Sequence, residues 1–262
     1  MNLSLRHLPL AELHIEDKTA MRPIAIYAAL ERRLLADDYR VSVLPKDAAR
    51  WDHALLLNLA FWEAQQGGDI LTDRSVPADV VCHMAWHHVA TAALATPGAP
   101  LSPEAMLLGE SIASAFDLYL LGRLLVVAPD GDFVGTQLPA MADVAEAAGV
   151  DNDAFEALVG EVTKAPEAAF ESLRALIYDV SVGLLAAETA EQALAVLVAH
   201  EDRRFGCLLH HFELASWLQH ARAARAALPA DDVTAARARE ADAALRAAVD
   251  PIAWLEANWL GG

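Results

Sequence analysis

Long stretches rich in alanine and leucine, interrupted by proline, glycine and helix-capping residues, constrain the fold of this chain most strongly. Alanine has the best intrinsic helix propensity, and the chain is 55% hydrophobic with only 6% aromatic residues. The interruptions favour breaks at Gly206 and Pro251 within the last two of nine expected helices. These helices are expected at 18–35, 46–66, 75–96, 102–126, 138–148, 153–164, 166–187, 190–227 and 231–259. The sequence therefore predicts a mainly α-helical, multi-helix fold.

The strongest turn signal is the segment Ala128-Pro129-Asp130-Gly131-Asp132. Because short apolar runs flank it, the signal is also compatible with a short hairpin over 125–135. It marks the best candidate boundary between a helical region at 1–128 and a C-terminal helical bundle at 138–262. No repeat or low-complexity linker separates the two regions, so we expect them to pack together as one unit.

Composition and charge exclude several classes of partner. The formal net charge of −18 repels a phosphate backbone and argues against nucleic acid. The most apolar stretch, 118–128, contains Arg123 and is shorter than the roughly 18–20 residues that span a bilayer. The segment 1–17 lacks the pattern of a secretory signal, and Cys82 and Cys207 lie in apolar helical stretches. We expect a cytoplasmic protein without a membrane or nucleic-acid partner, for which a homo-oligomer remains open.

The segment His83-Met84-Ala85-Trp86-His87 carries two histidines four residues apart. This spacing puts both imidazoles on one helix face, where they can share a metal ion. Glu110, in the next expected helix, would add a carboxylate and leave a fourth position open for water or substrate. The alternative is that Glu110 and Asp117 form an ordinary polar face and that the histidines have backbone or carboxylate partners.

The histidine pair and the sequence Glu-Ser-Ile-Ala-Ser-Ala-Phe-Asp at 110–117 resemble the zinc site of gluzincin metallopeptidases. Gluzincin aminopeptidases carry their glutamate ligand in a later helix that reads approximately Asn-Glu-Gly-aromatic-Ala-x-x-Phe-Glu. The resemblance covers about residues 80–121 and implies a zincin-like helical region. It also implies zinc ligation by His83, His87 and Glu110, with Asp117 accepting a hydrogen bond from a ligand histidine.

The chain departs from the gluzincin pattern at the residue that performs the chemistry. Met84 stands where H-E-x-x-H peptidases carry the glutamate that activates the metal-bound water. The region before His83 indicates helix and polar loop rather than the edge strand that binds substrate in that family. His88 is the nearest other catalytic candidate, although it lies about 100° around the helix from His87. Further departures are Gly109, Ser111 and Ile112.

Three functional hypotheses follow. The first is a zinc-binding, zincin-like protein that is degenerate as a peptidase or acts as a divergent zinc-dependent hydrolase. The second is a non-catalytic helical interaction protein or homodimer without metal. The third is a helical di-iron oxygenase, to which His210 and Glu213 would contribute. Their H-x-x-E order reverses the E-x-x-H motif of di-iron bundles, so a structural hydrogen-bonded pair is the favoured interpretation.

Overall fold

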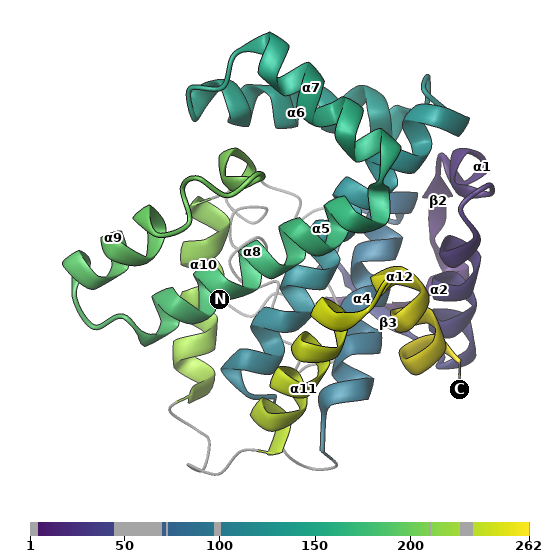
Figure 1. The fold of residues 1–262 in the computed structure, drawn as a ribbon. Coiled ribbons are helices and arrows are strands. Elements are labelled where there is room, and N and C mark those ends of the chain that lie inside the picture. Colours follow the sequence, from purple (N-terminus) through teal and green to yellow (C-terminus); the bar gives the residue numbers. More distant parts are fainter. Residues whose placement is uncertain are drawn as a thin grey trace. The chain divides into compact units, whose positions relative to one another are not determined.

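The computed structural model describes residues 5–44, 70–71, 73–96, 101–209, 211–225 and 233–261 (Figure 1). The chain divides into two compact units, Met1–Ala85 and Trp86–Gly262. In the described parts helices dominate and the strands are short, which confirms the predicted mainly α-helical fold. The helix expected at 46–66 lies outside the described residues. The division into regions 1–128 and 138–262 stays a prediction.

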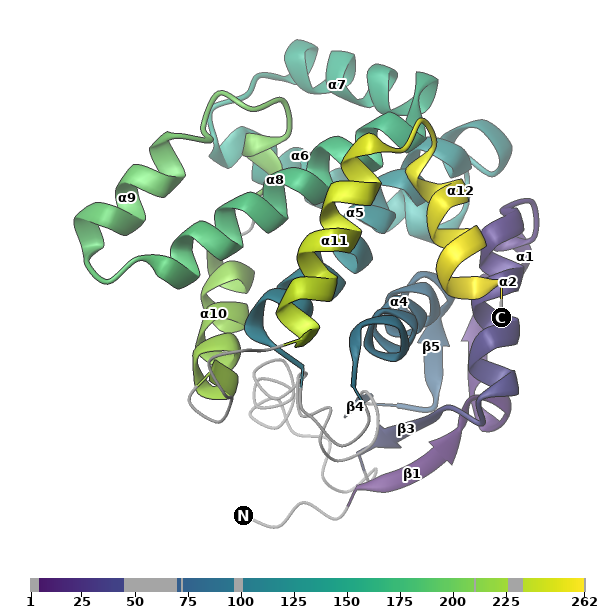
Figure 2. The ribbon, with the colours of Figure 1, turned by 60° about the horizontal axis from the view of Figure 1, so that its bottom comes forward.

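The first unit combines two small sheets with short helices (Figure 2). β3 pairs antiparallel with β1 and parallel with β4, while β2 pairs parallel with β5. Leu8 and Val41 face each other across β1 and β3, and both are buried. The elements are β1 (Arg6–Pro9), a 3-10 helix (Leu10–Glu12), β2 (His14–Glu16), α1 (Lys18–Met21), α2 (Ala25–Ala36), β3 (Arg40–Val43), β4 (Ile70–Leu71), β5 (Ser75–Pro77) and the first turns of α4 (Ala78–Leu94).

Two expectations for this unit were wrong. The helix expected at 18–35 is interrupted between α1 and α2, because Pro23 has no backbone N–H to continue the helical ladder. Ser75 does not begin a helix: residues 75–77 form β5, and α4 begins only at Ala78. A strand therefore directly precedes the histidine helix, where the sequence indicated helix and polar loop.

The second unit is built around α5, a helix of 25 residues that is buried along most of its length. Ser102 caps its N-terminus by accepting a hydrogen bond from the backbone N–H of Ala105 at 3.1 Å. α8 packs along α5, and α6, α7, α10 and α11 also contact it. The helices of this unit are α5 (Pro103–Val127), α6 (Asp132–Ala147), α7 (Asn152–Lys164), α8 (Pro166–Ala186), α9 (Ala190–Val198), a 3-10 helix (Gly206–Leu208), α10 (His211–Arg225), α11 (Val233–Ala247), α12 (Pro251–Leu255) and a π-helix (Glu256–Leu260), besides the rest of α4.

The turn at 128–131 connects two helices, so the hairpin considered over 125–135 is not formed. α5 continues through Val127, and the N–H of Ala128 still bonds to the carbonyl of Leu124 at 2.8 Å. α6 begins at Asp132, earlier than the expected position 138, because Phe133 and Val134 are buried and fix its first turn.

Other helix boundaries agree with the local signals. The expected helix at 190–227 is broken into α9, the 3-10 helix that starts at Gly206, and α10. A new helix begins at Pro251, and the capping box of Thr189 and Gln192 is formed at the start of α9. In the described parts of the chain, none of the helices has both the length and the apolar character needed to cross a bilayer.

Candidate metal centre

α4 carries both histidines of the sequence motif. His83 and His87 lie one helical turn apart, and both are partly exposed, His87 to 18%. Other side chains of the same helix, Met84 and Trp86 among them, are completely buried. The two imidazoles therefore occupy the more polar side of a helix that is otherwise packed into the core.

α5 brings Glu110 to the histidine helix. Its side chain is only 2% exposed. A Cβ atom added at Gly109 would lie 3.5 Å from the Cβ of Ala90, an ordinary van der Waals contact, so α4 and α5 lie side by side at this level. The rings of Trp86 and Phe116 pack edge to face across the same pair of helices, with centroids 5.3 Å apart. This packing fixes the carboxylate close to His87.

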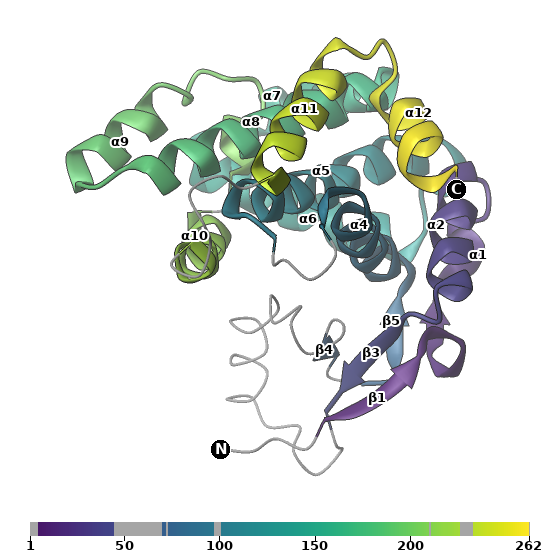
Figure 3. The same ribbon diagram turned by 90° about the horizontal axis from the view of Figure 1, so that it is seen from below.

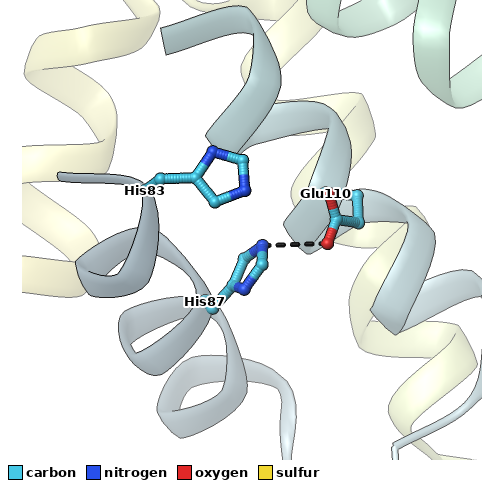
Figure 4. Close-up of side chains that lie close together, drawn as sticks. All are labelled: His83, His87 and Glu110. Carbon is cyan, nitrogen blue, oxygen red and sulfur yellow. Dashed lines mark ion pairs between the residues drawn. The ribbon is translucent and has the colours of Figure 1, made fainter. Parts of the chain in front are cut away.

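The structure brings His83, His87 and Glu110 together (Figure 4). Nε2 of His87 lies 2.9 Å from Oε1 of Glu110, and each of the three residues offers a ligand atom within 4.8 Å of the other two. In a tetrahedral zinc site with bonds of about 2.0–2.1 Å, ligand atoms lie roughly 3.3 Å apart. The three side chains are therefore close enough to bind one metal ion.

The chemistry of these donors also fits a metal. Zinc binds imidazole nitrogens and carboxylate oxygens, and three protein ligands leave one position for water or substrate. A buried carboxylate is costly to keep charged unless a cation or hydrogen-bond donors compensate it. A bound cation, or a protonated His87, would supply this compensation for Glu110.

The residue that would act as the base in a peptidase is apolar and buried here. The side chain of Met84 has 0% exposure and carries no group that can accept a proton from water. His88 is partly exposed and follows His87 on α4. It is not a member of the ligand group found among the described residues, so a catalytic role for His88 stays a prediction.

Asp117 lies two helical turns after Glu110 on α5 and is partly buried. α4 and α5 run antiparallel, since Ala90 is next to Gly109 and Trp86 contacts Phe116. Asp117 is not in the ligand group of the described residues, and its hydrogen bond to a ligand histidine stays a prediction.

The second cluster predicted from the sequence cannot be placed. His210 lies outside the described residues, and Glu213 belongs to α10 but its side chain also lies outside them. The expectation that these two residues form a structural pair stays a prediction, and so does a metal role for them.

Asp79 is a partly buried acid on the histidine helix that the sequence did not single out. It lies four residues before His83 on α4, so it shares a helix face with both histidines. Burial raises the pKa of Asp79; hydrogen bonds from backbone N–H groups at its own position and Val80 oppose this effect, and the Asp17 carboxylate adds to the increase. The i, i+4 spacing from His83 was the signal that could have revealed it.

Comparison of the chain with family models, with curated proteins and with solved structures finds no match. The interpretation of the centre therefore depends on its geometry and donor chemistry.

Proposed function

We propose that this protein binds a zinc ion through His83, His87 and Glu110 in a zincin-like site that is degenerate as a peptidase. The observation that carries the proposal is the convergence of two histidines on one face of α4 with the buried Glu110 of α5. Two imidazoles and one carboxylate with a fourth position left open are a common ligand set of catalytic zinc.

The thioether of Met84 limits the chemistry that a bound zinc ion would support, because it can neither accept nor donate a proton. Zinc lowers the pKa of bound water to about 7, so a hydroxide can form without a glutamate base. Cleavage of an amide also requires a proton for the leaving amine, and a thioether cannot supply it. If the centre is catalytic, we propose a divergent hydrolase that acts on substrates whose leaving group does not need to be protonated.

Metal titrations of matched variants test the proposal. The wild-type chain should bind one Zn²⁺, measured by competition with a coloured chelator and by elemental analysis after desalting. His83→Ala, His87→Ala and Glu110→Gln should each lose this binding. The matched controls are His14→Ala, an exposed histidine on β2, and Glu104→Gln in the first turn of α5; both should bind zinc like the wild type.

Thermal unfolding provides a second measurement. A ligand that binds only the folded state at 100 times its Kd stabilises that state by about 2.7 kcal/mol. Zinc should therefore raise the Tm of the wild type and of both controls, but not that of the three ligand variants. A wild-type chain that retains no zinc and shows no change in Tm would refute the proposal.

One feature favours the alternative of a non-catalytic interaction protein. α9 has no buried residue, although Leu194 and Val198, one turn apart, are apolar and exposed to 61% and 51%. α9 lies at the edge of the second unit in all three views (Figures 1, 2 and 3). If this face forms a homodimer, light scattering should show a dimer that Leu194→Glu converts to a monomer. A monomeric wild type would contradict the alternative.

A further inference from the structure

Helix α11 contacts the adjacent ends of the two helices that carry the metal ligands. The backbone N–H of Ser102, the N-cap of α5, donates a hydrogen bond to Oγ1 of Thr234 at 2.8 Å. Nη1 of Arg237 donates to the carbonyl oxygen of Ala95, just beyond the end of α4, at 2.6 Å. Figure 3 shows α11 beside α4 and α5. α11 thus links the end of one ligand helix to the start of the other.

Both links are equally far from the ligands. Ala95 follows His87 by eight residues, and Ser102 precedes Glu110 by eight residues. At about 1.5 Å per residue, each link lies roughly 12 Å along its helix from the ligand. α11 therefore bonds to the chain at the end of α4 and at the start of α5, at matching levels relative to the ligands.

α11 is itself fixed at its other end by ion pairs to α8. The guanidinium of Arg174, completely buried, lies 2.9 Å from Asp242 of α11. Arg246 of α11 lies 2.7 Å from Asp179 of α8. α11 is therefore bonded to α8 at one end and to Ser102 and Ala95 at the other.

We propose that Thr234 is a positioning residue for the metal centre: through Ser102 it sets the axial position of α5 and hence the placement of Glu110 opposite His87. A slip of one residue along a helix would move Glu110 by about 1.5 Å. Metal–ligand bonds tolerate deviations of only about 0.2 Å. In this proposal Thr234 acts through the backbone of Ser102, which precedes Glu110 by eight residues. The proposal rests on the proposed zinc site, but its structural part can be measured without metal.

The main test compares Thr234→Val with Thr234→Ser in the full-length chain. Valine keeps the shape of the buried threonine but removes the hydroxyl that accepts the Ser102 N–H, whereas serine keeps it. Mutations remote from a ligand commonly change its affinity by about 2- to 30-fold, and we expect zinc binding to weaken in this range for Thr234→Val. Thr234→Ser should bind like the wild type. Co²⁺ replaces Zn²⁺ as a spectroscopic probe, and its visible bands should change in Thr234→Val.

Thr163→Val is the matched control. The hydroxyl of Thr163 donates to the carbonyl of Val159 within α7, so it links no helices. This variant should lose some stability without a change in zinc affinity or in the Co²⁺ spectrum. A purely structural role of Thr234 would produce the same pattern as this control.

Hydrogen exchange of the metal-free proteins tests the positioning role of Thr234 independently of zinc binding. Amide protons of α4 near His87 and of α5 near Glu110 should exchange faster in Thr234→Val than in Thr234→Ser or the wild type. Unchanged exchange in Thr234→Val overturns the inference, whether or not the wild type binds zinc. An unchanged Co²⁺ spectrum and zinc affinity in Thr234→Val also overturn it, provided that the wild type binds. A wild type that binds no zinc refutes the zinc site, while faster exchange would still support the positioning of α5 by Thr234.

Discussion

Replacing Met84 with glutamate restores the H-E-x-x-H sequence and tests whether position 84 opens onto a peptidase cleft. Met84 is completely buried, so the introduced carboxyl group would have to stay protonated in the folded state. Protonating a glutamate of ordinary pKa near 4.3 at pH 7 requires about 3.7 kcal/mol, at 1.36 kcal/mol per pH unit. This is a large part of the roughly 5–15 kcal/mol that stabilises a typical protein. We therefore expect strong destabilisation and no peptidase activity.

The assay is urea denaturation of Met84→Glu at pH 7 and pH 5, with Met84→Leu and Met84→Gln as controls. Burial raises the folded-state pKa of the new carboxyl above its unfolded value, so the penalty is present at neutral pH and shrinks as the pH falls. It should decrease from about 3.7 to about 1 kcal/mol between pH 7 and pH 5. Met84→Gln should show no such pH dependence, and Met84→Leu should cost less than about 1.5 kcal/mol. A Met84→Glu variant that is as stable as Met84→Leu at pH 7 and cleaves peptides would refute this reasoning.

Three further predictions concern the second unit, each measured by equilibrium or thermal unfolding. Gly122→Ala should lower the free energy of unfolding by about 1–3 kcal/mol, because its Cβ would lie 2.7 Å from a backbone oxygen of α7. Gly160→Ala should raise it by about 0.5–1 kcal/mol, because its Cβ would meet nothing within 4 Å. Equal effects of the two variants would contradict the close approach of α5 and α7. Arg174→Met should cost about 3–5 kcal/mol because it removes the buried cation that pairs with Glu171, while Asp242 keeps its ion pair with Arg246. Adding Glu171→Gln should recover part of the loss, and a neutral Arg174→Met would contradict this. Burial raises the pKa of Asp179, but hydrogen bonds from two arginines outweigh it and keep this pKa below its usual value. The stabilisation that the ionised Asp179 gives the folded protein is therefore present above about pH 4 and is lost as the pH falls through the folded-state pKa. The stability of Asp179→Asn should be less sensitive to acid than that of the wild type, and an identical pH profile would contradict this.

Local signals explain why much of the helical structure could be predicted. α5 starts one residue after the expected position 102, because Ser102 as N-cap and Pro103 in the first turn act within a few residues. The strands β1 to β5 lacked such signals. They are only two to four residues long, and β2 pairs with β5 from a distant part of the chain. Runs this short do not establish a periodicity of two.

At the metal centre, too, contacts fixed by local sequence could be predicted and contacts between distant segments could not. His83 and His87 could be predicted as neighbours because a helix fixes residues four apart, and Glu110 follows on the next helix. The hydrogen bond between Ser102 and Thr234 of α11 could not be predicted, because the two residues lie 132 positions apart in sequence. This hydrogen bond depends on how the whole second unit packs, and no local pattern marks it.

The central claim is that His83, His87 and Glu110 bind one zinc ion, and anomalous diffraction at the zinc edge tests it most directly. Crystals of the wild-type chain grown with Zn²⁺ should show one strong anomalous peak about 2.0–2.2 Å from a nitrogen of each histidine and an oxygen of Glu110. Crystals of Glu110→Gln should lack this peak. A peak bound by other residues, or none at saturating zinc, would contradict the account.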